Sequence, residues 1–219
     1  MTVPCPIADE LLSFWFDDGL ASSAAARRFV DRCFGYHPEF DRALTARFAS
    51  LPARVAAGEF AYWRAHPGTA LAALIALDQL PRNIHRGTPH AYAYDTAARE
   101  LAAHAEAAGY PDALHPLAGA FFNLPWEHAE DLELQQRSVA GYTRQHARAD
   151  AEFAPILWEW VVAGRDHLEV IERFGRFPHR NAILGRESTA EERAWLENGG
   201  KHWGQVPAVT PPATSSGPA

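Results

Sequence analysis

Apolar side chains recur at helical spacing along almost the whole chain, and this pattern constrains the fold more than any other feature. Residues 68–80 are apolar nearly all round, which predicts a buried central helix that Pro81 ends. No segment alternates apolar and polar residues between hairpin turns, so no β-strand is predicted. The expected fold class is therefore all-α, with antiparallel helix pairs joined by short loops.

Capping residues and helix breakers set the other boundaries. Ser22 or Ser23 is expected to cap the second helix, and Ser188 and Glu191 are expected to form a capping box for the last one. Pro52 should bend or break the third helix. The remaining expected helices span residues 7–16, 23–34, 39–57, 60–65, 88–108, 114–122, 125–147, 152–174 and 188–197.

The 219 residues suit a single helical domain over residues 1–198. Residues 199–219 are rich in Pro, Ser and Gly and lack a periodic apolar pattern, so they are expected to form a disordered tail. No repeat recurs at a fixed period.

Composition excludes several classes of protein. The formal net charge of −7 argues against a nucleic-acid partner. No apolar run is long enough for a transmembrane helix, and the N-terminal residues do not resemble a signal peptide, so a cytoplasmic location is expected. The two cysteines form no disulfide or zinc pattern. No nucleotide or haem motif occurs, and neither GxSxG nor GxxxxGK[ST] is present.

A first polar cluster interrupts the helical pattern at residues 77–89, LDQLPRNIHRGTP. Asp78 falls in the last turn of the expected central helix, where the helix dipole disfavours a carboxylate. An arginine partner is therefore expected, either Arg82 or an arginine of residues 173–186. Either this pair is a structural ion pair, or Asp78, Gln79, Arg82 and Asn83 contribute to a ligand-binding site.

A second cluster lies on the helix expected over residues 125–147. At 100° per residue, His128 and Asp131 fall within its apolar stripe and Glu127 lies at the edge, whereas Glu130 is expected to point away. Inward-facing polar groups without hydrogen-bond partners cost about 1–3 kcal/mol each. The helix dipole favours acidic residues here but does not explain His128 or Asp131. In a metal-free enzyme, His128 would be a general base oriented by Asp131.

His167 lies at the margin of the inward stripe of the helix expected over residues 152–174. It is either a hydrogen-bonded core histidine or a ligand or base in a site. As a metal ligand, His167 or alternatively His179 would be the fourth beside Glu127, His128 and Asp131. The spacing matches neither HExxH nor the paired Glu-x-x-His of di-iron bundles, so a metal site stays one alternative.

The segment RFGRFPHRNAILGR, residues 173–186, concentrates arginines among aromatic residues. Phe174 and Phe177 are expected to hold this loop against the core. Its guanidinium groups are expected to pair either with Asp78, Glu127 and Asp131 or with a bound anion. The candidate ligand-binding residues of this loop are Arg173, Arg176, His179, Arg180 and Asn181.

Three segments carry a resemblance to a known family: LDQLPRNIHRGTPHAYAYD, LPWEHAEDLELQQRSV and HLEVIERFGRFPHRNAILGRESTAEERAWL. Together with the start LLSFWFDD, they resemble the domain-of-unknown-function 924 family in content and order, over residues 7–198. The resemblance implies an all-α bundle similar to tetratricopeptide-repeat proteins, and it implies no activity. The chain has LPWEH where the family often has MPFEH, a change that affects packing more than chemistry.

Three functions remain open from these residues. The first is a helical binding module whose arginines hold a small anion or an acidic peptide. The second is a hydrolase-like or metal-assisted enzyme that uses Glu127, His128 and Asp131. The third is a buried polar network that only fixes the packing of the helices.

Overall fold

The computed structural model describes residues 5–205, and every regular element in this range is a helix. The all-α fold class is therefore confirmed for these residues. Buried side chains from α1 (Pro6–Phe16) through α11 (Ala154–Phe174) form one hydrophobic cluster. A single helical domain over residues 1–198 stays a prediction. The tetratricopeptide-repeat-like arrangement stays a prediction.

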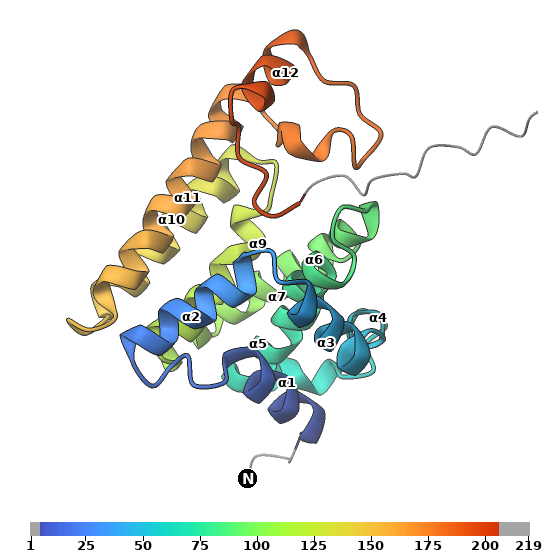
Figure 1. The fold of residues 1–219 in the computed structure, drawn as a ribbon. Coiled ribbons are helices and arrows are strands. Elements are labelled where there is room, and N and C mark those ends of the chain that lie inside the picture. Colours follow the sequence, from blue (N-terminus) through green and yellow to red (C-terminus); the bar gives the residue numbers. More distant parts are fainter. Residues whose placement is uncertain (1–4, 206–219) are drawn as a thin grey trace, which may run out of the picture.

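Helices of very different length follow one another with short connections (Figure 1). Most of the short elements labelled η are 3-10 helices, and one is a π-helical turn. Between α1 and α11 the order is α2 (Ser23–Phe34), α3 (Pro38–Phe48), α4 (Leu51–Ala56), η1 (Ala61–Ala65), α5 (Pro67–Leu74), η2 (Ile75–Gln79), α6 (Leu80–Ile84), η3 (Pro89–Tyr92), α7 (Asp95–Ala107), η4 (Tyr110–Ala113), α8 (Pro116–Ala120), η5 (Phe121–Asn123), α9 (Leu124–Glu127) and α10 (Leu132–Arg148); η6 (Pro178–Arg180) and α12 (Ala190–Glu197) follow α11.

The central apolar segment is helical, but Pro81 does not end it as predicted. The backbone N–H of Leu80 donates to the carbonyl of Ile75, five residues back, which closes the π-helical turn η2. Pro81 then lies in the first turn of α6, a position that tolerates proline. The chain therefore stays helical to Ile84 and carries the polar residues of the first cluster along a buried helix.

Two other long helices expected from the sequence are broken. The segment over residues 88–108 splits into η3 and α7, and the segment over residues 125–147 splits into α9 and α10. The second break arises because Asp131 is the N-cap of α10, where its side chain accepts a hydrogen bond from the backbone N–H of Leu134 at 3.0 Å. The predicted stripe therefore does not exist as one continuous helix face.

Helices α10 and α11 pack along their lengths as a hairpin that extends beyond the other helices (Figure 1). Gly175 ends α11 in the left-handed conformation (φ +68°), as predicted. Phe177 is fully buried in a small cluster with Val170 and Ile171, so it holds the following loop as expected, whereas Phe174 is only partly buried.

The capping box of α12 lies one residue later than predicted. The Thr189 side chain accepts from the backbone N–H of Glu192, whose carboxylate accepts from the backbone N–H of Thr189. No helix among residues 5–205 combines the length and the apolar character needed to cross a membrane.

Candidate functional site

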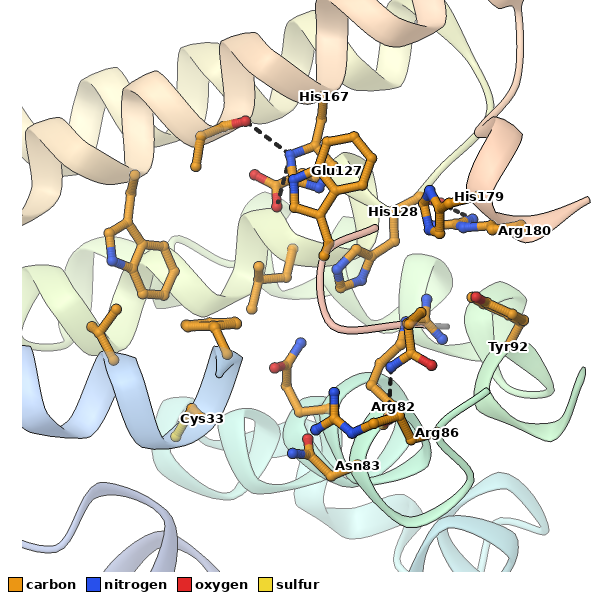
Figure 2. A pocket seen from close by; sticks show the side chains of 18 of the residues that line it. Cys33, Arg82, Asn83, Arg86, Tyr92, Glu127, His128, His167, His179 and Arg180 are labelled. Carbon is orange, nitrogen blue, oxygen red and sulfur yellow. Dashed lines mark hydrogen bonds and ion pairs between the residues drawn. The ribbon is translucent and has the colours of Figure 1, made fainter. Parts of the chain in front are cut away.

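A cavity of about 260 Å³ lies where α2, α6, α9 and α11 meet the loop after α11 and the last described residues. Figure 2 shows side chains from these distant segments turned toward one space. Eight residues that the sequence predicted as site residues line it: Gln79, Arg82, Asn83, Glu127, His128, His167, His179 and Arg180. The three sequence clusters therefore converge on one cavity.

The other predicted site residues lie outside this cavity. Asp78 is fully buried next to it. Asp131 is exposed at the start of α10. Arg173 pairs with Glu191 at 2.9 Å, Arg176 pairs with Glu192 at 2.6 Å, and the buried amide of Asn181 donates to Ser188 and Glu192. Three of the predicted ligand-binding residues thus serve the attachment of α12.

His128 is held by Asp78 rather than by Asp131, which corrects the predicted dyad. The Nδ1 atom of His128 lies 2.8 Å from Oδ1 of Asp78. The other Asp78 oxygen accepts from Gln79 at 2.6 Å, and Arg82 lies 4.0 Å from the carboxylate. Burial raises the pKa of Asp78, but His128, Arg82 and Gln79 together outweigh this and leave the pKa below its usual value. An ionised Asp78 accepts from Nδ1–H, so Nε2 is the nitrogen of neutral His128 that carries a lone pair.

Glu127 and His167 lie side by side in the cavity (Figure 2), with Nδ1 of His167 at 3.6 Å from Oε1 of Glu127. Burial raises the pKa of Glu127 to about 8, which makes this side chain a neutral carboxylic acid at pH 7. Burial lowers the pKa of His167 to about 3. The neutral imidazole donates from Nδ1 to the Ala163 carbonyl at 2.8 Å.

Arg180 differs from the two other guanidinium groups that line the cavity. Arg82 pairs with Asp95 at 2.9 Å, and Arg86 pairs with Asp41 at 2.9 Å. Arg180 donates to the His128 carbonyl at 2.9 Å, but among residues 5–205 no carboxylate lies within ion-pair distance of it. Burial lowers its pKa to about 10, so the group stays charged at neutral pH.

Aromatic rings surround this cation. Its guanidinium carbon lies 4.3 Å from the ring centre of Phe177 and 4.8 Å from that of Tyr92. Five buried polar atoms of the cavity side chains have no hydrogen-bond partner among the described residues: Nη2 of Arg82, Nε of Arg180, Nδ1 of His179 and the hydroxyls of Tyr92 and Tyr142. Nε of Arg180, Nδ1 of His179 and the Tyr92 hydroxyl lie at the Arg180 end. Buried polar groups are normally satisfied, so this end of the cavity has unmet hydrogen-bonding capacity.

Residues 199–205, here called the C-terminal strap, form one wall of the cavity. The indole of Trp203 stacks on His167 with 4.1 Å between ring centres, and Gln205 donates to the Arg82 carbonyl at 2.8 Å. Gln205 also accepts from the backbone N–H of Gly87 at 3.0 Å. The prediction of a disordered tail is therefore wrong for residues 199–205, because these contacts hold the strap against α6 and α11; residues 206–219 lie outside the described residues.

Sequence reasoning missed several other lining residues. Arg86 and Tyr92 belong to the segment LDQLPRNIHRGTPHAYAYD, but they do not fall on an inward-facing stripe of an expected helix, so the sequence pattern does not identify them. Trp203 is a large aromatic residue in the glycine-rich stretch of the strap, and this is the feature that could have indicated a contact with the core. The apolar part of the wall includes Val30, Cys33, Phe34 and Trp160.

The predicted metal ligands do not gather. Within the described chain, no group of three or more His, Cys, Asp or Glu side chains is placed to hold a metal ion. His128 turns its Nδ1 to Asp78, and Asp131 caps α10, so Glu127 and His167 remain as a pair. The metal-assisted alternative therefore loses its ligand set.

Comparisons with known proteins agree with the resemblance seen in the sequence. The family model described as "Bacterial protein of unknown function (DUF924)" matches residues 11–200. A solved structure of a protein of unknown function from Agrobacterium tumefaciens is 35% identical, with a TM-score of 0.74, over 88% of this chain and 98% of that one. No curated protein matches the chain. The chain therefore belongs to the DUF924 family of bacterial proteins of unknown function.

Proposed function

We propose that the cavity binds a small organic anion that carries an apolar substituent. The observation that carries this proposal is Arg180, a fully buried guanidinium with no carboxylate partner among residues 5–205. Asp95 and Glu130 act on Arg180 only from beyond ion-pair distance. A buried charge without a direct partner is costly, and a bidentate carboxylate or phosphate is the group that a guanidinium fork recognises. A bound anion at Arg180 would supply the missing charge.

The surrounding hydrogen-bonding groups support the same occupant. The free Nε of Arg180, Nδ1 of His179 and the Tyr92 hydroxyl all belong to side chains at this end of the cavity. Glu127 adds no negative charge at neutral pH because burial keeps it protonated. The site is thus electrostatically suited to an anion even though the whole chain carries a net charge of −7.

Size and polarity define the rest of the ligand. A volume of about 260 Å³ lies below the range of roughly 300–1,000 Å³ typical of drug-sized ligand pockets, which favours a small molecule over a peptide. Away from Arg180, the wall is formed by α2 and α11 side chains such as Val30, Phe34 and Trp160. An aliphatic or aromatic substituent gains about 25 cal/mol per Å² by burial there.

Isothermal titration at pH 7 with 4-methylpentanoate, phenylacetate and inorganic phosphate tests the proposal. The two carboxylates are expected to bind more tightly than phosphate, which lacks the apolar part. Arg180→Gln should weaken binding by roughly 10- to 100-fold, as expected when a charged hydrogen-bonding partner is lost. Arg173→Gln is the matched control, because Arg173 lies on the surface beside Glu191 and should bind like the wild type.

Two results would contradict the proposal. One is the absence of heat with all three anions. The other is equal affinity of Arg180→Gln and Arg173→Gln, which would place the anion away from Arg180.

A further inference from the structure

We infer that the same cavity is an active site for proton transfer on small oxo acids: His128 removes a proton from the carbon next to the carbonyl group, and Glu127 protonates the carbonyl oxygen. The inference rests on the proposed anion binding, because Arg180 would hold the carboxylate of the substrate. The reaction class is enolisation, which leads to isomerisation or exchange at that carbon.

The Asp78–His128 pair has the geometry of an oriented general base. Asp78 is fully buried, and its two oxygens are occupied by Nδ1 of His128 at 2.8 Å and Nε2 of Gln79 at 2.6 Å. This arrangement fixes the imidazole orientation and tautomer, as carboxylate–histidine pairs do in hydrolases. Nε2 of His128 has no hydrogen-bond partner among the described residues, and the side chain lines the cavity.

The two other histidines of the cavity are poor bases. Burial lowers the pKa of His167 to about 3 and that of His179 to about 2, so both bind a proton too weakly near neutral pH. His128 is instead partly exposed, and the Asp78 carboxylate stabilises the imidazolium that forms when Nε2 takes a proton. The base is therefore assigned to His128 and the positioning role to Asp78.

Glu127, the residue before His128, supplies the acid. Both side chains line the cavity from the end of α9 (Figure 2). With a pKa of about 8, the Glu127 carboxyl holds its proton at pH 7 and can release it at a small free-energy cost. A neutral carboxylic acid in an apolar site can also donate a hydrogen bond to the carbonyl oxygen before the proton moves.

Covalent catalysis is not favoured by the lining side chains. Within the described residues, the wall contains neither a serine nor a threonine, and burial holds the pKa of the Cys33 thiol far above its usual value. Cys33 also lies on α2, away from Arg180 (Figure 2). Proton transfer needs no side-chain nucleophile.

The step balances without a further reactant. The C–H bond breaks as an N–H bond forms at Nε2 of His128. The electron pair forms the C=C bond, and the carbonyl oxygen takes the proton of Glu127 to give the enol. The reverse transfers restore neutral His128 and protonated Glu127. A proton that exchanges with solvent in between labels the carbon.

The test is deuterium incorporation at C3 of 2-oxo-4-methylpentanoate in D₂O, followed by proton NMR against a buffer blank. The wild type is expected to accelerate exchange. His128→Asn keeps a donor toward Asp78 but removes the base, and Glu127→Gln keeps a hydrogen-bond donor but removes the acidic proton. Each should slow exchange by roughly 100-fold or more, the usual contribution of a general acid or base. His146→Asn on α10 is the control and should exchange like the wild type.

Asp78→Asn separates positioning from folding. It should slow exchange by roughly 10-fold and alter the pH profile of the exchange rate, while the Kd for 4-methylpentanoate, which has no carbonyl group to enolise, stays unchanged. A purely structural role would move stability without this separation of rate from affinity.

The outcomes distinguish this inference from the proposed function. If 4-methylpentanoate binds in an Arg180-dependent way but 2-oxo-4-methylpentanoate exchanges no faster than in buffer, anion binding stands and the active site is refuted. If neither compound binds, both are refuted. Exchange that survives in folded His128→Asn and Glu127→Gln would also overturn the assignment.

Discussion

Arg176 and Arg180 lie four residues apart in the same arginine-rich loop, yet they have opposite surroundings. Arg176 holds the Glu192 carboxylate with two nitrogens at 2.6 and 2.8 Å and lowers the pKa of Glu192 to about 2. Arg180 is buried between Tyr92 and Phe177, and among the described residues no carboxylate lies within ion-pair distance of it, although Asp95 and Glu130 act on it from farther away. The density of arginines in a loop is therefore a weak indicator of a binding site, whereas a buried guanidinium without an ion-pair partner is a stronger one.

The remaining arginines of the loop follow the example of Arg176. Arg186 forms two bonds to Glu130, at 2.6 and 2.8 Å, and Glu130 also accepts from the backbone N–H of Phe177 at 2.9 Å. Glu130, which was expected only to point away from the apolar stripe of its helix, thus takes the role expected of Asp131. The loop of residues 173–186 does contact a segment about fifty residues earlier in the chain, but through Glu130 rather than through Asp131.

Phe177→Ala should have the largest effect on stability, because this ring anchors the arginine-rich loop of residues 173–186 to the core. Phe177 is fully buried and contacts Arg180, His167 and Trp203. We expect the free energy of unfolding in urea to fall by about 3–5 kcal/mol and anion binding to be lost as well. Phe174→Ala, at a partly buried ring, should cost clearly less; equal losses would mean that Phe177 does not anchor the loop.

The pH dependence of stability should be the next largest effect. It should arise from Glu127 in the cavity rather than from the ion pairs of the loop. The pKa of Glu127 is about 8 in the folded chain against a usual 4.5, so between these values the folded state holds a proton that the unfolded state has lost. The free energy of unfolding therefore falls as pH rises through this range. His167 and His179 have lowered pKa values and act in the opposite direction, but only below about 6.5.

The unopposed window thus runs from pH 6.5 to 8, where the loss should amount to about 2 kcal/mol at 1.36 kcal/mol per pH unit. Of the groups that influence Glu127 from neighbouring elements, Asp78 has a pKa below its usual value and Tyr142 has a pKa well above its own, so neither titrates in this window. Chemical denaturation at several pH values measures the slope. Glu127→Gln should remove it, and a slope that persists in this variant would assign the proton elsewhere.

Glu192→Ala should have the smallest effect on the cavity, because Glu192 serves the attachment of α12. It removes the capping box of α12 and the partner of Arg176, and the loss of a cap alone costs about 1 kcal/mol. Arg176 is partly exposed and can be hydrated. Glu191→Ala, which breaks only an exposed pair, is the control and should stay within about 0.5 kcal/mol. A large loss of affinity for 4-methylpentanoate in Glu192→Ala would contradict the separation between the Arg176–Glu192 pair and the cavity at Arg180.

Periodicity and capping rules were sufficient for the fold class and for most helix boundaries, because these depend on local sequence. The boundaries of α1, α2 and α11 lie within two residues of the prediction. The breaks at η2 and before Asp131 were missed, since a π-helical turn and a mid-segment N-cap leave no gap in the apolar pattern.

Predicted residues line the cavity where polar side chains fell on an expected inward face, as at Glu127, His128 and His167. The partners were harder to predict. Gln205 contacts Arg82 across 123 residues, and Asp78 rather than Asp131 holds His128 across 50 residues. Such pairings depend on the tertiary arrangement of helices, which local spacing does not encode.

The π-helical turn at residues 75–79 makes the cavity sensitive to the deletion of a single residue in this segment. A π turn holds one residue more than an α-helical turn and has weaker hydrogen-bond geometry, so a single deletion there would restore a regular helix. The same deletion would rotate one end of the central helix by about 100° relative to the other and carry Arg82 and Asn83 out of the cavity wall. At this place a more regular helix and an intact cavity exclude each other.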